Sequence, residues 1–260
     1  MLARKAVSTK NYSRKRISRI PASPFEMILS KKFVKWNKLW QAPYEGMFSY
    51  QSNNITRYFE YPWAFYAVKL KKGMNILDFG GGLSGLQFVL YKCGVKVHNV
   101  DPGIKNPKWA VNEKMINKLN KKFDTKVKLY NNYIEKVKLP SNFYDVVYNI
   151  SVLEHLKKRE LSNAIKEIFR ILKPRGYLVM TVDLFLNAYP FTKNKIVSHG
   201  ENVSIKKLIN LSKMKLVHGC KSELFGFKEF NKKRVLENLH KYIIGFGDPC
   251  LVQTIVLQKN

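Results

Sequence analysis

The stretch Asn75–Gly85, which reads NILDFGGGLSG, decides the fold of this chain. Its strand-like part, Ile76–Phe79, is apolar except for one aspartate and is typical of a short buried strand. Three consecutive glycines, Gly80–Gly82, then permit backbone conformations that other residues avoid and keep side chains away from a ligand. Apolar residues at helical spacing follow from Ser84 until Gly94 ends the pattern. A bare glycine turn before a helix N-terminus predicts a site for a polar or anionic ligand group.

The glycines belong to a longer pattern. Gly80, Gly82 and Gly85 fit G-x-G-x-x-G, and a second predicted strand, Val95–Val100, ends at Asp101. Asp101 stands 19 residues after Gly82, which is the spacing of an acid that binds the hydroxyls of a ribose. We therefore expect a nucleotide-type ligand on a Rossmann-like unit, with a ligand-free tight turn as the alternative. The pattern alone fits a nicotinamide cofactor and S-adenosylmethionine equally.

Asp78 favours the second of these cofactors. It lies two residues before the first glycine, where a carboxylate would repel the pyrophosphate of a dinucleotide. S-adenosylmethionine has no phosphate and carries a sulfonium and an ammonium group. A carboxylate at the tip of the strand suits that cation.

Two further segments carry a resemblance. They are Tyr144–Leu156, YDVVYNISVLEHL, and Ile171–Met180, ILKPRGYLVM. Together with the glycine motif and Asp101, they look like the class I S-adenosylmethionine-dependent methyltransferases. The run Glu60–Trp63, EYPW, resembles a subgroup often associated with small-molecule or sugar methylation. The match is good over residues 57–185 and loose beyond them.

The resemblance implies an α/β, Rossmann-like fold: a seven-stranded, mostly parallel sheet with helices on both faces and an antiparallel last strand. It also implies S-adenosylmethionine as cofactor. In the family an aspartate commonly accepts a hydrogen bond from the adenine amino group, but the matching position here is Asn132, whose amide oxygen can still accept. The residues expected to bind the cofactor are Asp78, Gly80, Gly81, Gly82, Leu83, Ser84, Asp101, Pro102, Asn132, Tyr133, Asn149, Ile150 and Ser151.

The remaining elements follow from periodicity. Pro62 is expected in the first turn of a helix that covers the crevice. Ser151 and Glu154 fit a capping box at a helix start. Further strands are predicted over Val127–Tyr130, Tyr144–Ile150, Tyr177–Val182, Lys215–Cys220 and Cys250–Leu257, and further helices over Asn106–Lys122, Leu161–Leu172, Asn202–Leu211 and Arg234–Ile243.

Methyl transfer to a hydroxyl needs a base, and His155 has the right pKa range. The competing interpretation is that His155 lies at a helix start and contacts the backbone or the cofactor. Glu154 and Glu60 are the next candidates, and each also has a helix-capping interpretation. Glu60, Trp63 and Tyr189 are candidate substrate contacts. The histidines show no metal-ligand spacing, so no metal is expected.

The chain has 260 residues and a formal net charge of +29. Its lysines are scattered rather than clustered, and an AT-rich genome would account for many of them, so nucleic-acid binding is not favoured. The charge still favours an anionic acceptor, such as a phosphorylated or nucleotide-linked sugar. An RNA or protein methyltransferase that uses a basic arm remains the alternative function, together with a nicotinamide oxidoreductase.

Three parts are expected along the chain: a basic tail at 1–25, a helical cap at 26–70 and a methyltransferase domain at 71–260, divided at 185 into cofactor and substrate halves. The tail contains no acidic residue and could be a transit peptide, a phosphate-binding arm or a solvated tail. No stretch is apolar enough to span a membrane, and the three cysteines lack metal or redox spacing. These features predict a cytoplasmic protein.

Overall fold

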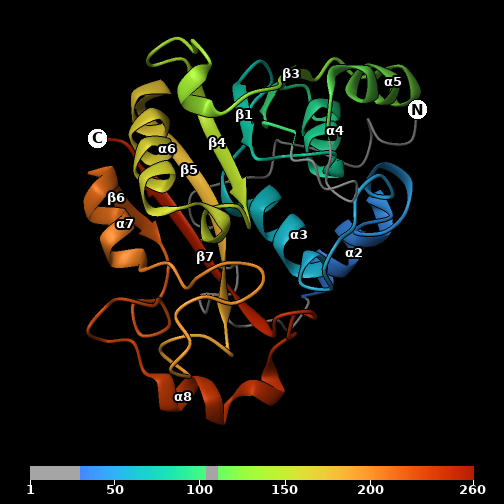
Figure 1. Ribbon diagram of the computed structural model, residues 1–260. Coiled ribbons are helices and arrows are strands. Elements are labelled where there is room, and N and C mark those ends of the chain that lie inside the picture. Colours follow the sequence, from blue (N-terminus) through green and yellow to red (C-terminus); the bar gives the residue numbers. More distant parts are fainter. Residues whose placement is uncertain (1–29, 104–110) are drawn as a thin grey trace.

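A computed structural model describes residues 30–103 and 111–260. Its centre is a seven-stranded sheet in the order β3-β2-β1-β4-β5-β7-β6 (Figure 1). The strands are β1 (Asn75–Phe79), β2 (Lys96–Val100), β3 (Lys128–Tyr130), β4 (Tyr144–Ile150), β5 (Leu172–Phe185), β6 (Lys215–His218) and β7 (Cys250–Gln258). The first five strands are parallel, and β7 runs antiparallel to both β5 and β6. The sheet predicted from the sequence is confirmed, including its antiparallel last strand.

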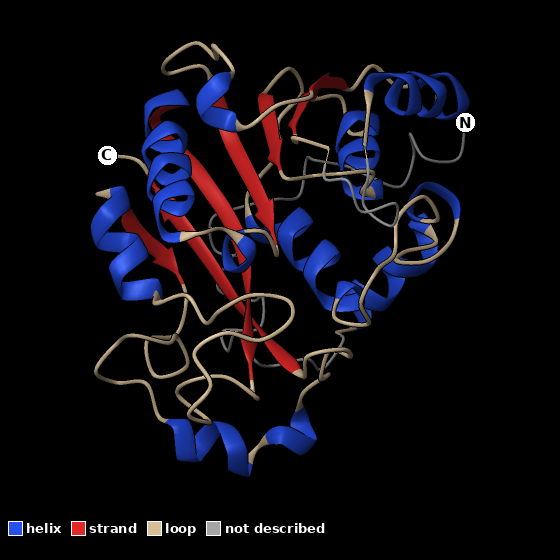
Figure 2. Cartoon of the chain, viewed as in Figure 1, coloured by secondary structure: helices blue, strands red, loops and turns tan. Residues whose placement is uncertain are grey.

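The helices cover both faces of this sheet (Figure 2). The α-helices are α2 (Lys31–Trp40), α3 (Arg57–Ala67), α4 (Gly85–Lys92), α5 (Glu113–Phe123), α6 (Lys158–Ile171), α7 (Ile205–Ser212) and α8 (Lys232–Glu237). Short 3-10 turns are η3 (Gly46–Phe48), η4 (Ile134–Lys136), η5 (Leu153–His155) and η6 (Leu239–Lys241). Long loops and α8 gather beyond the end of the sheet to which β5 extends (Figure 1).

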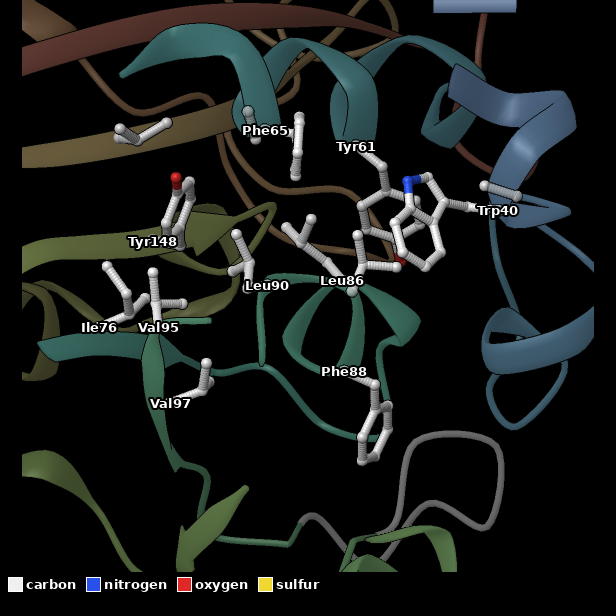
Figure 3. Close-up of a cluster of buried hydrophobic side chains, with 14 of the residues drawn as sticks. Trp40, Tyr61, Phe65, Ile76, Leu86, Phe88, Leu90, Val95, Val97 and Tyr148 are labelled. Atoms are coloured by element: carbon white, nitrogen blue, oxygen red, sulfur yellow. The ribbon is translucent and has the colours of Figure 1, made fainter. Parts of the chain in front are cut away.

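Alternate residues of each strand reach opposite faces, which explains the two large cores. In β1, Ile76 belongs to the core that α2, α3, α4 and α5 share, whereas Leu77 belongs to the core that includes α6 and α7. Figure 3 shows the first core, where Tyr61 and Phe65 of α3 meet Leu86 of α4 above the sheet. Because α3 packs against both the sheet and α4, this packing positions its polar residues over the strand ends.

Helix α3 begins earlier than predicted. It starts at Arg57, so Pro62 lies inside the helix and not in its first turn. A proline there cannot donate to the carbonyl of Tyr58, four residues back. That carbonyl instead accepts a hydrogen bond of 2.7 Å from the side-chain amide of Asn37 on α2. The packing of α2 against α3 therefore replaces the missing backbone bond.

The predicted capping box at Ser151 and Glu154 is wrong. The chain leaves β4 through Ser151 at φ 49° and then makes only the short turn η5, without a side-chain cap. The long helix α6 begins at Lys158, where the carboxylate of Glu160 accepts from the Lys157 N–H at 2.9 Å. The side chain of Ser151 is thereby free to bind neighbours across the sheet edge.

Other boundaries also differ from the prediction. Strand β5 begins at Leu172, five residues before the predicted Tyr177, because Leu172 already pairs with Tyr144 before a shift in register. Helix α5 begins at Glu113, capped by the side chain of Asn112, and the predicted start at Asn106 lies outside the described residues. The predicted last helix divides into α8 and η6.

Candidate functional site

The glycine turn after β1 surrounds the side chain of Asp78. Asp78 is 2% exposed, and its Oδ2 has no hydrogen-bond partner in the described chain. A Cβ on Gly81 would lie 2.5 Å from this oxygen, so the turn admits the carboxyl only because glycine stands there. Burial, followed by the charge of Asp101, raises the pKa of Asp78 to about 7. The site therefore holds a buried carboxyl that a cationic ligand group would stabilise in its ionised form.

Asp101, at the end of β2, ties two turns together. Its Oδ2 accepts from the Gly82 N–H at 2.9 Å and its Oδ1 accepts from the Gly103 N–H at 2.8 Å. Burial raises the pKa of Asp101, and these two backbone bonds oppose that rise. Each carboxylate oxygen keeps further acceptor capacity, as contact with two ribose hydroxyls requires.

Three residues of the N-terminal segment reach this turn, and none of them was predicted. Gln51, Arg57 and Tyr61 line a small cavity, together with Asp78, Gly80, Gly81, Ser84 and Ile150. Gln51 also accepts from the Leu83 N–H at 2.9 Å. The cavity volume is about 20 Å³, enough for about one water molecule. A nucleoside ligand therefore requires the side chains of the cap to move aside.

The residues at the site fit S-adenosylmethionine in their chemistry. Asp78 suits its cationic groups, Asp101 suits its ribose, and the glycines leave room for close backbone approach. Asn132 and Tyr133 lie exposed after β3, where Asn131 donates to the carbonyl of Asp101 at 2.9 Å. Their contact with adenine stays a prediction.

The other predicted cofactor residues gather at the ends of three neighbouring strands, β2, β1 and β4. Pro102 is half-buried directly after Asp101, and Ser84 caps α4 by accepting from the Leu86 N–H. Asn149 is fully buried, and its amide donates to the Phe79 carbonyl at 3.2 Å. Their side-by-side position follows from the pairing of β1 with β4.

Beside the cavity, Glu60 is the centre of a buried hydrogen-bond network. Its Oε2 accepts from the Arg57 guanidinium in a short contact, and its Oε1 accepts from Ser151 Oγ at 2.8 Å and Thr181 Oγ1 at 2.6 Å. Arg57 also donates to Ser151 Oγ at 2.9 Å. Although burial lowers it, the pKa of Arg57 is raised overall because Glu60 lies beside the guanidinium. Arg57 and Glu60 thus form a closed ion pair that connects α3 to β4 and β5.

Two more carboxyl groups lie next to this ion pair. Glu154 is 1% exposed, and its Oε1 accepts from the Asp183 N–H at 3.0 Å. Burial raises the pKa of Glu154 to about 7. Burial and the charge of Glu154 raise the pKa of Asp183 as well. The part of the site around Glu60, Glu154 and Asp183 is therefore rich in carboxyl groups, although the whole chain is strongly basic.

One of the two ring nitrogens of His155 makes a hydrogen bond to the backbone. Its Nδ1 lies in a short contact with the carbonyl of His199, and a carbonyl only accepts, so Nδ1 carries the proton. The Nε2 atom is then the basic nitrogen. His155 is exposed as a residue, although partial burial of its ring lowers the pKa of the imidazole.

The loop that supplies His199 is held by Asp248. Its Oδ2 accepts from His199 Nδ1 at 2.8 Å, from the His199 N–H at 2.9 Å and from Ser198 Oγ at 2.8 Å, while Asn187 donates to its Oδ1 at 2.8 Å. Burial acts against it, but these bonds hold the pKa of Asp248 well below its usual range. The position of His155 therefore depends on a loop fixed by a carboxylate 49 residues from His199.

Two predicted substrate contacts lie elsewhere. Trp63 is fully buried and packs near the ring of His218, so its ring belongs to the core. Tyr189 is 60% exposed, and its ring contacts Phe225 edge to face. Glu60, in contrast, lies within the site, although its carboxylate is already bound.

Sequence reasoning missed Arg57, Thr181 and Asp183. Arg57 carries the only signal that was available, since it is one of nine arginines in a lysine-rich chain and lies three residues before Glu60 of the EYPW segment. Thr181 and Asp183 lie in an apolar strand, where nothing marks them as different from buried structural residues. Among the described residues, no cluster of histidines, cysteines and acids is arranged to hold a metal ion. No helix in the described ranges is long and apolar enough to cross a membrane.

Comparison with known proteins agrees with this geometry. The chain matches the methyltransferase domain family over residues 38–204. It is 30% identical over 125 residues to the sterol 24-C-methyltransferase erg6 of Aspergillus fumigatus, a match that covers 46% of this chain and 30% of that protein. It is also 30% identical over 123 residues to an uncharacterized methyltransferase, YdaC, of Bacillus subtilis, covering 46% of this chain and 62% of YdaC. The matched stretch thus spans less than two thirds of either relative.

Solved structures share the fold at low identity. A putative sarcosine dimethylglycine methyltransferase from Galdieria sulphuraria has a TM-score of 0.54 at 13% identity, covering 89% of this chain and 99% of that one. The YcgJ protein of Bacillus subtilis has a TM-score of 0.53 at 14% identity, covering 77% and 98%. The [4+2]-cyclase SpnF has a TM-score of 0.54 at 13% identity, covering 76% and 80%. Because one of these proteins is a cyclase, the fold alone does not fix the reaction.

Proposed function

The chain belongs to the methyltransferase domain family, with S-adenosylmethionine as its cofactor, and on that premise we propose that it methylates an oxygen or nitrogen of a small molecule. The observation that carries this proposal is the buried carboxyl of Asp78, whose Oδ2 lies against a turn of three glycines and has no hydrogen-bond partner among the described residues. A pyrophosphate would be repelled there, which argues against the nicotinamide alternative. A sulfonium or ammonium group would be attracted.

The cofactor supplies an activated methyl group, and the residues of the chain position donor and acceptor. Asp78 and the turn Gly80–Gly82 would hold the cationic part, and Asp101 would hold the ribose. The cap residues Gln51, Arg57 and Tyr61 would close over the cofactor from α3 and the segment before it. Water would thus be excluded from the cofactor by elements that precede β1.

His155 is proposed as the base for an acceptor hydroxyl or amine. Its neutral ring presents Nε2, because Nδ1 donates to the His199 carbonyl. A base in this position contributes about 10²- to 10⁴-fold to a rate that depends on proton removal. Glu154 is the second candidate, since burial raises its pKa to about 7 and thereby places its proton exchange near neutral pH.

We place the acceptor beside Glu60, Glu154 and Asp183, and call this part of the site the acceptor side. Its enclosure favours a small acceptor over a macromolecule. Glu60 and Glu154 are 0% and 1% exposed, and the loop around His199 covers the same strand ends. The basic segment that motivated an RNA or protein substrate lies outside the described residues. That alternative rests on the sequence of this segment, which contains no acidic residue, and on the net charge of +29.

The test is to measure S-adenosylhomocysteine release with three fractions of one cell extract: molecules below about 1 kDa, RNA and protein. We expect release with the small-molecule fraction, and we expect His155→Ala to reduce it by about 10²-fold or more. His240→Ala, an exposed histidine on η6, is the matched control and should leave the rate unchanged. Release with the RNA or protein fraction only would overturn the proposed substrate class.

A further inference from the structure

The carboxyl groups on the acceptor side outnumber the cations available to them. Glu60 is paired with Arg57, and its two oxygens accept three side-chain hydrogen bonds. Glu154 and Asp183 lie beside this closed pair without a lysine or arginine partner among the described residues. The buried Glu154 and the half-buried Asp183 thus form no direct ion pair with a lysine or arginine in the described part of the chain.

Asp183 receives only a weak hydrogen bond. Ser151 has one hydroxyl proton and two carboxylates within reach, Glu60 Oε1 at 2.8 Å and Asp183 Oδ1 at 3.3 Å. The shorter contact takes the proton, since Glu60 is the nearer acceptor. The carboxyl of Asp183 therefore has unused acceptor capacity towards the site.

Glu154 provides an independent sign of a missing partner. It is 1% exposed, and its Oε2 has no hydrogen-bond partner in the described part of the chain. A buried polar atom without a partner costs about 1–3 kcal/mol. A ligand that donates hydrogen bonds to Glu154 and Asp183 would remove this cost.

Hydrogen bonds connect these carboxyls to the cavity at the glycine turn. Arg57 lines the cavity beside Asp78 and Gly81, and the same guanidinium donates to Ser151, which reaches Asp183. We propose that the methyl acceptor is an amine whose ammonium form is held by Asp183 and Glu154. This inference rests on the proposed function and names its substrate class, in place of the anionic acceptor expected from the net charge.

The reaction balances with residues already described. The ammonium gives one proton to Nε2 of His155, and the free amine attacks the sulfonium methyl group. The new N–C bond forms as the C–S bond breaks, and sulfur keeps the electron pair. The products are S-adenosylhomocysteine and the methylated ammonium, so the positive charge moves from sulfur to nitrogen. Carboxylates placed beside the nitrogen stabilise that movement.

Other acceptors fit this arrangement less well. A carboxylate or phosphate would face two like charges. A neutral alcohol would leave the two carboxyls without a counter-ion in a buried site. Arg57 offsets them only in part, because its charge is already paired with Glu60.

Sinefungin tests the proposal without knowledge of the acceptor. In this analogue an amine-bearing carbon replaces the methylated sulfur of S-adenosylmethionine, so its ammonium lies where the methyl group meets the acceptor. Calorimetric titrations at about pH 8 compare sinefungin with S-adenosylmethionine and with S-adenosylhomocysteine, which lacks the positive charge at sulfur. The variants are Asp183→Asn and Glu154→Gln, because glutamine can still accept from the Asp183 N–H. Asp124→Asn is the matched control, since Asp124 is an exposed acid at the end of α5.

We expect the wild type to bind sinefungin about tenfold or more tightly than S-adenosylhomocysteine. Each site variant should weaken sinefungin about tenfold while changing the other two ligands less than about twofold, and the control should change none. If the variants leave sinefungin unchanged, or weaken S-adenosylmethionine equally, the carboxyls do not serve an acceptor amine and the proposal is wrong. Retained binding of S-adenosylhomocysteine reports that each variant is folded. Failure of the wild type to bind any of the three ligands would instead overturn the proposed function itself.

Discussion

At the scale of single residues, the site depends on carboxyls in unfavourable places. Asp78, Glu154 and Asp183 all have pKa values raised by burial. Such shifts concentrate at functional sites because ionising a buried group is costly unless a ligand compensates. Asp78 could be found from the sequence, since the glycines follow it directly. Asp183 could not, because it interrupts an apolar strand as a structural residue would.

The raised pKa of Asp78 predicts a pH dependence of cofactor binding. Below about pH 7 this carboxyl is protonated and must lose its proton to face a cation, so S-adenosylmethionine should bind more tightly as the pH rises from 6 to 8. Asp78→Asn should weaken binding and remove that slope. Methylthioadenosine, which lacks the amino-acid part and the sulfonium, should show no slope in either protein. A slope that persists in the variant would assign it to another group.

At the scale of elements, the cap is held by a side chain that replaces a backbone bond. Helix α3 carries Pro62 in its interior, and Asn37 of α2 donates to the Tyr58 carbonyl that the proline leaves free. The sequence predicted a helical cap over residues 26–70 and a helix that contains Pro62, so helices were expected where α2 and α3 lie. It could not show this contact, which joins residues 21 positions apart. Arg57 and Glu60 on α3 reach the site only because this packing fixes the helix.

A double-mutant cycle measures the contact. Asn37→Ala should destabilise the protein by about 1–3 kcal/mol, because the Tyr58 carbonyl loses its donor. Pro62→Ala restores a backbone N–H to the helix, so in that background the same change should cost less. Urea unfolding of the four proteins gives the coupling. Equal costs in both backgrounds would show that the amide does not substitute for the missing backbone donor.

At the scale of the whole molecule, the net charge of the chain is positive, whereas most ionisable groups of the acceptor side are carboxyls. The chain carries +29, yet the buried Glu60 and Glu154 and the half-buried Asp183 lie together with only one guanidinium, that of Arg57, among the described residues. Net charge is a property of the surface and here predicted an anionic acceptor, whereas the groups nearest the proposed transfer site favour a cation. The sheet order was predictable because four motifs in sequence imply one topology. The acceptor side was not, because it joins α3, β4, β5 and the loop at His199, which are distant in sequence.

The most direct test of the account is a calorimetric titration of the chain with S-adenosylmethionine, repeated with Asp101→Ala and with Glu237→Ala, an exposed acid on α8, as control. We predict micromolar binding that is lost in Asp101→Ala, retained in the control and nearly independent of salt, since no phosphates are involved. NADH, titrated alongside, should not bind. No binding of S-adenosylmethionine to the wild type, or equal binding by Asp101→Ala, would contradict the assignment of the glycine turn and Asp101 as the cofactor site.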